Sequence, residues 1–276
     1  MKKVSLIATD IDNTLLTREK ELTPRTCKAI QAAVANGIHI CFTSGRAPFA
    51  LDFLQKEIGA NILLGCYSGG MTLDNGHKVG SHPLEYASIR EILKITRSLQ
   101  CSVLAYSTDD CFSEKSGYWE KYESRITGHK TKLVDFESLI DDFERTDEPI
   151  YKLLLMDREE KQLDETIGII KSSGIHVSQL KSSPYFDEIN PPDVSKAVAL
   201  QDMCAYFGIQ LDETVAFGDY YNDIDIFKVA GHSFAMLNAP DEVKCHATDV
   251  TAYDCDHDGL AYEIERLIEG TCRQSV

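Results

Sequence analysis

Short apolar runs alternate along the chain with longer segments in which apolar residues recur every three or four positions. The runs at 4–9, 38–43 and 60–69 are typical of strands that are buried on both faces. The segments at 24–36 and 48–59 predict amphipathic helices between them. This alternation predicts an α/β fold with a doubly wound, Rossmann-like parallel sheet that is covered by helices on both sides.

Local signals support several of these boundaries. Thr23 and Pro24 are typical of the N-cap and the first residue of a helix, and Asn36-Gly37 is typical of its end. Asn75-Gly76, between two short runs of strand-forming residues, predicts a β-hairpin.

The pattern changes after Pro83 and returns near residue 189. A helix at 86–100 opens the middle region, and an acidic stretch at 109–148 reads as irregular. Further strands and a helix follow, before the core pattern resumes with a helix at 194–208. The sequence therefore predicts one catalytic core interrupted by an inserted α/β cap domain, with the core at 1–83 and 189–276 and the cap at 84–188.

The chain is strongly acidic, with a formal net charge of −16 over 276 residues. Nucleic acids and anionic bilayers attract cationic surfaces, so this charge argues against nucleic-acid and membrane partners. No apolar run approaches the length that crosses a bilayer. The expected partner is a phosphorylated small molecule, for reasons given below, and the expected state is a monomer or a small homo-oligomer.

The nine cysteines are scattered singly, without the close pairs of a zinc site or a disulfide framework. Such thiols are typical of a reducing compartment. The N-terminus has two lysines, a short apolar run and then an acid, which fits a first strand better than a signal peptide. The expected location is the cytoplasm.

Polar side chains gather where the predicted core strands end. Ligands of parallel sheets bind outside the carboxyl ends of the strands. Asp10 and Asp12 follow the first strand and, being two positions apart, can face one ligand. The other candidates follow the second strand, open the helix at 194–208 or follow the strand at 214–219: Ser44, Gly45, Lys196, Asp219, Asn222 and Asp223.

This set of residue types indicates phosphoryl transfer. Several carboxylates around one point repel each other, and Mg²⁺, which takes oxygen ligands beside phosphate groups, relieves that repulsion. The Ser44 hydroxyl, the loop amides of Ser44 and Gly45 and the amine of Lys196 can bind phosphate oxygens. One carboxylate would attack phosphorus to form an aspartyl-phosphate, and a second would protonate the leaving oxygen and then activate water.

Each signal alone is ordinary. Asp12-Asn13-Thr14 could be a turn or a helix cap, and a lysine in a first helical turn is most often solvated. Their occurrence together, at three strand ends and in chain order, favours a single site over three unrelated caps.

Five stretches resemble the haloacid dehalogenase superfamily, and specifically its Cof-type (subclass IIB) phosphatases. "DIDNTLL" resembles the first motif, DxDGTL, and "TSGR" resembles the second. "EINPPDVSKAVAL" resembles the stretch around the third-motif lysine, and "AFGDYYNDIDIF" resembles the fourth motif, GDxxNDxxM. "DHDGLAYEIERLI" resembles the closing helix, so the similarity spans the whole chain.

The resemblance implies roles for the matched residues. Asp10 would be the nucleophile and a metal ligand, and Asp12 the general acid/base, with its backbone carbonyl also on Mg²⁺. Asp219 and Asp223 would complete the metal site. The phosphate would be held by Ser44, Gly45, Lys196 and Asn222, with Thr43 as a rival to Ser44.

Three positions depart from the family pattern. Asn13 replaces the usual glycine, but asparagine tolerates left-handed backbone better than most residues, so the turn is expected to survive. Tyr220-Tyr221 replace smaller residues and are expected to pack, or else to narrow the site. Ile226-Phe227 replace a methionine-containing end, which is expected to change packing only.

The expected activity is Mg²⁺-dependent hydrolysis of a small phosphorylated metabolite, such as a sugar phosphate or a phosphorylated cofactor, with the cap closing over the site. A phosphomutase acting on a sugar phosphate shares every core motif and is the alternative among enzymes. A non-catalytic phospho-acceptor or binding module is the alternative of another class.

Overall fold

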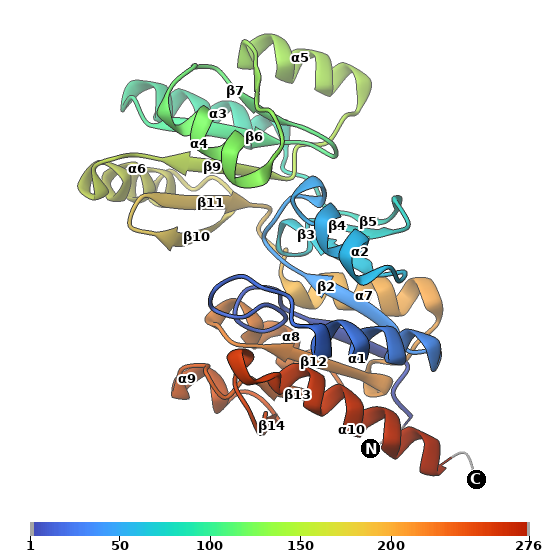
Figure 1. Cartoon of the computed structure of the whole chain (residues 1–276). Helices are drawn as coiled ribbons and strands as arrows, with labels where there is room; N and C mark the ends of the chain where they lie inside the picture. Colours follow the sequence, from blue (N-terminus) through green and yellow to red (C-terminus); the bar gives the residue numbers. More distant parts are fainter. Residues whose placement is uncertain (1–2, 275–276) are drawn as a thin grey trace. The chain divides into compact units, whose positions relative to one another are not determined.

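The computed structural model describes residues 3–274, with side chains up to residue 270, and divides the chain into two compact units (Figure 1). The first unit contains the residues up to 46, 51–81 and those from 195 onward. The second contains 47–50 and 82–194, a longer stretch than the predicted insert at 84–188. No described helix is both long and apolar enough to cross a membrane.

The first unit is built on a sheet that is parallel except at one edge. Its strands are β1 (Leu6–Thr9), β2 (His39–Thr43), β3 (Leu63–Cys66), β4 (Met71–Asp74), β5 (His77–Ser81), β12 (Thr214–Gly218), β13 (His232–Ala235) and β14 (Asp249–Val250). Over the described residues their spatial order is β14-β13-β12-β1-β2-β3-β4-β5. The pairs from β14 to β3 are parallel, and β3-β4 and β4-β5 are antiparallel.

Strand β1 lies between β2 and β12 and is fully buried, as its apolar run predicts. Leu6 pairs with His39 on one side and with Thr214 on the other. The carboxyl ends of β1, β2 and β12 therefore meet at one edge of the sheet, although β12 follows β1 by some two hundred residues. This edge carries the predicted site residues.

Helices cover both faces of this sheet. They are α1 (Pro24–Ala35), α2 (Asp52–Ile58), α7 (Lys196–Phe207), α8 (Ile224–Val229), α9 (Asp241–Lys244) and α10 (Gly259–Gln274), with 3₁₀ turns η2 (Tyr67–Gly69), η3 (Leu211–Glu213), η4 (Tyr221–Asp223) and η5 (Cys255–His257). Helices α7 and α8 pack Leu200, Met203 and Phe227 into a core cluster with residues of β1. Helices α1 and α10 contact each other on the opposite face (Figure 1).

The predicted local signals are confirmed. Thr23 precedes α1, and its hydroxyl accepts a hydrogen bond from the Thr26 amide at 3.1 Å. Asn75 and Gly76 both have positive φ, +48° and +78°, as the tight turn between β4 and β5 requires.

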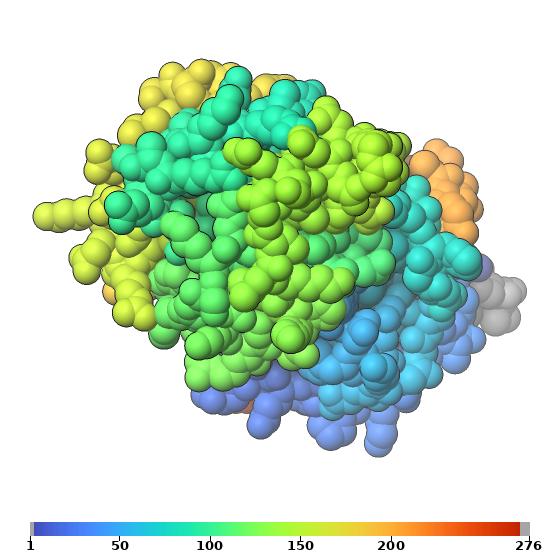
Figure 2. Space-filling view, turned by 90° about the horizontal axis from the view of Figure 1, so that it is seen from above, coloured from blue at the N-terminus to red at the C-terminus, as the bar shows by residue number. Residues whose placement is uncertain are grey.

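The second unit is a largely antiparallel sheet with helices packed on it. Its strands are β6 (Ser102–Tyr106), β7 (Cys111–Ser113), β8 (Lys132–Leu133), β9 (Lys152–Met156), β10 (Ser178–Ser183) and β11 (Phe186–Asn190), and its helices are α3 (Tyr86–Ser98), α4 (Tyr118–Thr127), α5 (Phe136–Thr146) and α6 (Glu160–Ser172), with the 3₁₀ turn η1 (Pro48–Ala50). Its core joins residues of α3, α5 and α6 to one face of the sheet. Figure 2 shows the surface of this unit in green and yellow-green.

The stretch at 109–148 is more regular than the sequence predicts. It contains two helices, α4 and α5, and two short strands. Asp135 caps α5 by accepting a hydrogen bond from the Ser138 amide at 2.9 Å. The prediction was wrong because numerous acids obscured the helical spacing of Phe136 and Ile140, which are buried.

The cysteines agree with the absence of a disulfide framework. Among the described side chains, the eight cysteines form no disulfide, and most are buried. The side chain of Cys272 lies outside the described ones.

Asp187, on β11, is a buried acid that accepts no hydrogen bond from the described residues. It is 1 % exposed, and neither of its carboxylate oxygens has a hydrogen-bond partner among the described residues. It pairs across the sheet with Leu155 of β9 and with Lys181 of β10, whose charge opposes the effect of burial on the pKa of Asp187. Burial raises the pKa of Asp187 to about 7.

We expect Asp187→Asn to stabilise the second unit in alkaline solution, by roughly 2–4 kcal/mol at about pH 8. The folded chain keeps this proton up to about pH 7, whereas an unfolded chain releases it near pH 4. The wild-type protein therefore loses stability as the pH rises through this window, and the amide, which does not ionise, removes that loss. The gain should disappear toward about pH 4.

Urea unfolding followed by tryptophan fluorescence measures this effect, because the single tryptophan, Trp119, lies in the second unit. Asp141→Asn is the matched control, since Asp141 is on α5 of the same unit and its side chain is 72 % exposed. An Asp187→Asn protein no more stable than wild type in alkaline solution would contradict this account.

Candidate active site

Three carboxylates from two strand ends converge at the edge where β1 and β12 terminate. Asp10 directly follows β1, Asp219 directly follows β12, and Asp223 ends the turn η4. One oxygen from each of the three lies within 4.8 Å of the other two, and all three side chains are buried. Such a concentration of negative charge requires a cation.

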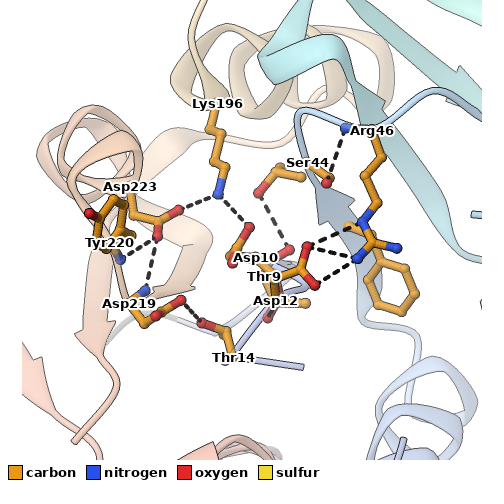
Figure 3. A network of polar contacts seen from close by, with 12 residues as sticks. Thr9, Asp10, Asp12, Thr14, Ser44, Arg46, Lys196, Asp219, Tyr220 and Asp223 are labelled. Carbon is orange, nitrogen blue, oxygen red and sulfur yellow. Dashed lines mark hydrogen bonds and ion pairs between the residues drawn. The ribbon is translucent and has the colours of Figure 1, made fainter. Parts of the chain in front are cut away.

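Lys196 supplies part of that positive charge. It is the first residue of α7 and, with 1 % exposure, is buried rather than solvated. Its Nζ donates to Asp10 Oδ1 at 2.5 Å and to Asp223 Oδ1 at 2.6 Å (Figure 3). Burial alone would lower the pKa of Lys196, but the two carboxylates outweigh burial and raise it.

The loop after β12 is organised by Asp223. Its Oδ2 accepts hydrogen bonds from the backbone amides of Asp219 and Tyr220, both at 2.9 Å (Figure 3). A Cβ atom at Gly218 would lie 2.3 Å from Asp223 Cγ, so only glycine permits this close approach. The "GDYYND" spacing therefore folds the loop back on itself and aims Asp219 at the cluster.

The environment raises the pKa of two of the acids. Burial is the main cause for Asp10, whose pKa rises to about 7; Lys196 opposes this rise and Asp223 adds to it. Burial, with a contribution from Asp223, raises the pKa of Asp219 to about 6. Their environment therefore disfavours the charged form of both acids, and a bound cation would stabilise that form.

The donor set fits a hard divalent cation. Asp10 Oδ1 is bonded to Lys196, and Asp219 Oδ1 accepts a hydrogen bond from the Thr14 hydroxyl at 3.0 Å, but the Oδ2 atoms of both acids have no hydrogen bond among the described residues. One or two carboxylate oxygens beside a phosphate are the protein ligands that Mg²⁺ prefers. Asp223 Oδ2 already accepts two backbone amides, whereas Oδ1 accepts only the Lys196 ammonium and keeps a lone pair that could bind a metal.

Asp12 lies beside the cluster but is held by other partners. The Arg46 guanidinium contacts both of its carboxylate oxygens, and Lys20 forms an ion pair with it at 3.0 Å. Burial alone would raise the pKa of Asp12, but Arg46 and Lys20 outweigh burial and hold the pKa below its usual value.

The loop after β2 differs in detail from the prediction. The Ser44 amide donates to Gly65 O at 2.8 Å, so it does not point toward a phosphate as the sequence suggested. The Ser44 hydroxyl accepts from the Arg46 amide at 3.2 Å, whereas the Thr43 hydroxyl lies 3.4 Å from Thr9 O. Both hydroxyls thus have backbone contacts, and the loop places Ser44 nearer to Arg46 (Figure 3).

All three departures from the family pattern can be checked. Asn13 adopts φ +62°, which confirms that asparagine occupies the left-handed turn position. Tyr220 and Tyr221 are 56 % and 49 % exposed, so the expectation that they pack was wrong. Their rings contact each other, with centroids 5.0 Å apart, because both leave the loop on its solvent side.

Ile226 and Phe227 behave as predicted, being 1 % and 4 % exposed in the core. Asn222, in η4, is partly buried and makes no hydrogen bond to any described residue. The structure therefore brings Asp10, Lys196 and the two acids of the β12 loop together, and leaves Asn222 outside that network.

A family model described as haloacid dehalogenase-like hydrolase matches residues 7–264. The chain belongs to this family. The resemblance found in the five motifs is thereby confirmed, and so is the assignment as a hydrolase.

Individual relatives match this haloacid dehalogenase-like hydrolase over nearly its whole length. A Haemophilus influenzae protein named "Putative phosphatase" is 30 % identical to it, covering 94 % of this chain and 96 % of the relative. A 5-amino-6-(5-phospho-D-ribitylamino)uracil phosphatase of Bacillus subtilis is 29 % identical, covering 96 % and 98 %. A haloacid dehalogenase-like hydrolase from Bacteroides thetaiotaomicron superposes with a TM-score of 0.85 at 26 % identity, covering 96 % of this chain and 100 % of that one, which confirms the predicted fold class.

Three contacts in the site of this hydrolase were not predicted from sequence. The Thr14 hydroxyl donates a hydrogen bond to Asp219, the Arg46 guanidinium donates to Asp12, and Lys20 forms an ion pair with Asp12. Thr14 and Arg46 both lie inside stretches that matched family motifs, so their position was a signal. Lys20 lies outside these motifs, and only the fold of the loop reveals its contact.

Proposed function

We propose that the chain is a Mg²⁺-dependent phosphatase that hydrolyses a small phosphorylated metabolite through an aspartyl-phosphate at Asp10. The observation that carries the proposal is the placement of Asp10 at the end of β1, bonded to the buried Lys196 and within 4.8 Å of Asp219. Family membership and the matched relatives, two of which are named as phosphatases, support the same reaction.

In the first step, an Asp10 oxygen forms a bond to phosphorus while the bond between phosphorus and the ester oxygen breaks. The electron pair of that bond stays on the ester oxygen, which takes a proton from Asp12. Because Arg46 and Lys20 hold the pKa of Asp12 below its usual value in the free protein, substrate binding would have to raise that pKa for Asp12 to carry this proton. In the second step, Asp12 accepts a proton from water, the water oxygen bonds to phosphorus, and the Asp10 carboxylate leaves. The product is inorganic phosphate.

Lys196 and the metal have distinct parts in this proposal. The buried ammonium of Lys196 keeps Asp10 oriented and is placed to stabilise charge on the phosphoryl oxygens. Mg²⁺, held by Asp10, Asp219 and the Asp12 backbone carbonyl, would offset the charge of the acids and of the substrate phosphate. Asp223 would act mainly by holding Lys196 and the β12 loop.

The substrate class follows from chemistry and from the relatives. The proposed reaction requires only a phosphate ester, so we propose a small phosphomonoester as substrate: a sugar phosphate or a phosphorylated cofactor or cofactor precursor. The Bacillus subtilis relative carries the name of a phosphatase for a phosphorylated ribitylamino-uracil, which supports the second group. We also propose that the middle unit is the family's cap domain and that the enzyme acts in the cytoplasm.

A panel of phosphorylated metabolites tests the function directly. We expect free phosphate to be released over many turnovers from at least one small phosphomonoester. Isomerised phosphosugar with little free phosphate would indicate the phosphomutase alternative. At most one phosphate bound or released per chain would indicate a phospho-acceptor module.

Metal removal is the second test of this function. We expect dialysis against EDTA to lower turnover by at least about 100-fold, since a metal supplies several kcal/mol of charge stabilisation. Millimolar Mg²⁺ should restore it. Isothermal titration of the metal-free protein with Mg²⁺ gives an independent reading: binding should be lost in Asp219→Asn and retained in Asp241→Asn, at a side chain that is 97 % exposed. Full activity in EDTA would contradict the metal requirement.

A further inference from the structure

The guanidinium of Arg46 contacts both oxygens of the Asp12 carboxylate, an arrangement called a fork below. Arg46 Nη2 donates to Oδ1 at 2.7 Å and to Oδ2 at 3.0 Å, and Arg46 Nε donates to Oδ2 at 3.2 Å (Figure 3). A planar guanidinium that contacts both oxygens fixes the plane of a carboxylate, which a single point charge does not.

The backbone of Arg46 is itself held in place at the end of β2. Its amide donates to the Ser44 hydroxyl at 3.2 Å, and its carbonyl accepts from the Tyr67 amide at 3.1 Å. The side chain reaches from this loop to the loop after β1 (Figure 3). The orientation of Asp12 is therefore fixed by contacts from the end of a second strand, β2, and not only by its own loop.

Lys20 holds the same carboxylate more loosely. It contacts Asp12 Oδ1 alone, at 3.0 Å, and its side chain is 51 % exposed. It sits in a tight turn with φ +64°, in which its amide donates to Thr17 O at 2.9 Å. A lysine in left-handed backbone is strained, and such strain persists where the surrounding structure imposes it. Lys20 therefore holds Asp12 by one contact from a half-exposed side chain, whereas Arg46 holds it by three.

We propose that Arg46 is the positioning residue of the reaction: its fork holds the Asp12 carboxyl group in the plane from which it delivers a proton to the leaving oxygen. The inference rests on the proposed function, because it assigns Arg46 a part in the step that Asp12 performs. Arg46 does not touch the reacting atoms and acts only through Asp12.

Two aryl phosphates of similar size separate positioning from a general structural role. The 4-nitrophenolate of 4-nitrophenyl phosphate departs without a proton, whereas the phenolate of phenyl phosphate is more basic and needs one. We expect Arg46→Ala to lower kcat on phenyl phosphate by about 10- to 100-fold, and on 4-nitrophenyl phosphate by less than about threefold. Asp12→Asn should show the same selectivity with a larger loss.

Chemical rescue distinguishes loss of the guanidinium contact from a packing defect, because an added small guanidinium compound does not repair a packing defect. Methylguanidinium added to Arg46→Ala should restore part of the kcat on phenyl phosphate, because it can reproduce the fork. Arg46→Lys should remain defective, since an ammonium contacts the carboxylate as a point charge. Arg25→Ala is the matched control: Arg25 forms the same kind of fork on Glu265, at 3.0 and 2.7 Å, on the exposed surface of α1.

The outcomes distinguish the two proposals. If the wild-type protein releases phosphate from no phosphomonoester, these two and the metabolite panel included, the proposed function falls and the role of Arg46 falls with it. If it acts on the panel but on neither aryl phosphate, the same comparison is made with two active esters whose leaving groups differ in basicity. If the wild-type protein hydrolyses both, the positioning role is overturned by an equal loss on the two esters in Arg46→Ala, by no loss, or by a failure of methylguanidinium to restore activity.

Discussion

Asp10→Asn is expected to abolish phosphate release, with a loss of at least about 10³-fold in kcat. An amide oxygen is a poor nucleophile and cannot form the acyl-phosphate, so neither step of the proposed reaction can proceed. Acid quenching of the wild-type enzyme during turnover should reveal a phosphorylated chain by mass spectrometry, and the variant should show none.

The fold should survive this change. Asparagine has nearly the shape of aspartate, and it removes the charge of one of the two buried carboxylates that share Lys196. The circular dichroism spectrum and the urea midpoint should therefore match those of the wild-type protein or exceed them. Asp241→Asn, at an exposed position, is the control for the chemical change itself. Near-normal turnover in a folded Asp10→Asn protein would remove Asp10 from the nucleophile role.

Lys196→Met should damage both stability and catalysis. Methionine fills a similar volume but leaves Asp10 and Asp223 without their shared cation, at a position that is 1 % exposed. Breaking a buried ion pair by removing one partner costs about 3–5 kcal/mol. Loss of a preorganised cation at the reacting phosphate costs about 10²–10³-fold in kcat.

Stability is best measured by urea unfolding in EDTA, so that a metal cannot replace the missing ammonium. Asp10→Asn combined with Lys196→Met should recover part of the lost free energy of unfolding, because one of the unpaired charges is removed. Lys228→Met is the matched control, since Lys228 is 57 % exposed and its one ion pair among the described residues is with Asp225. A Lys196→Met protein as stable as the wild type would show that the buried ion cluster does not need this lysine.

Much of the first unit could be predicted from sequence because its signals are local. The apolar run of β1, the cap at Thr23 and the Asn75-Gly76 turn each depend on a few neighbouring residues. The placement of Asp10 and Asp219 also follows from a simple rule, since parallel strands bring their carboxyl ends to one edge. Lys196 could be named as a candidate, but its burial could not be foreseen from a helix start alone.

The features that were missed depend on contacts between distant segments. The Arg46–Asp12 fork joins two strand ends through a long side chain whose direction no periodicity encodes. Tyr220 is exposed because of the way Asp223 folds the loop back on itself. Its aromatic residue type alone predicts burial instead. Asp187 lies between Phe186 and Glu188 in its strand, and nothing in the sequence shows that its carboxylate has no hydrogen-bond partner among the described residues.

The central position of β1 has a consequence for how the polypeptide is made. During translation the ribosome delivers β1 and β2 early, but β12, the other neighbour of β1, emerges only after the whole of 82–194. Until then β1 presents an unpaired apolar edge, the kind of surface that recruits chaperones or other nascent chains. The middle unit, which is nearly continuous in sequence, can fold meanwhile. The proposed active site is therefore completed last, when the residues from 195 onward dock and bring Lys196 and Asp219 next to Asp10.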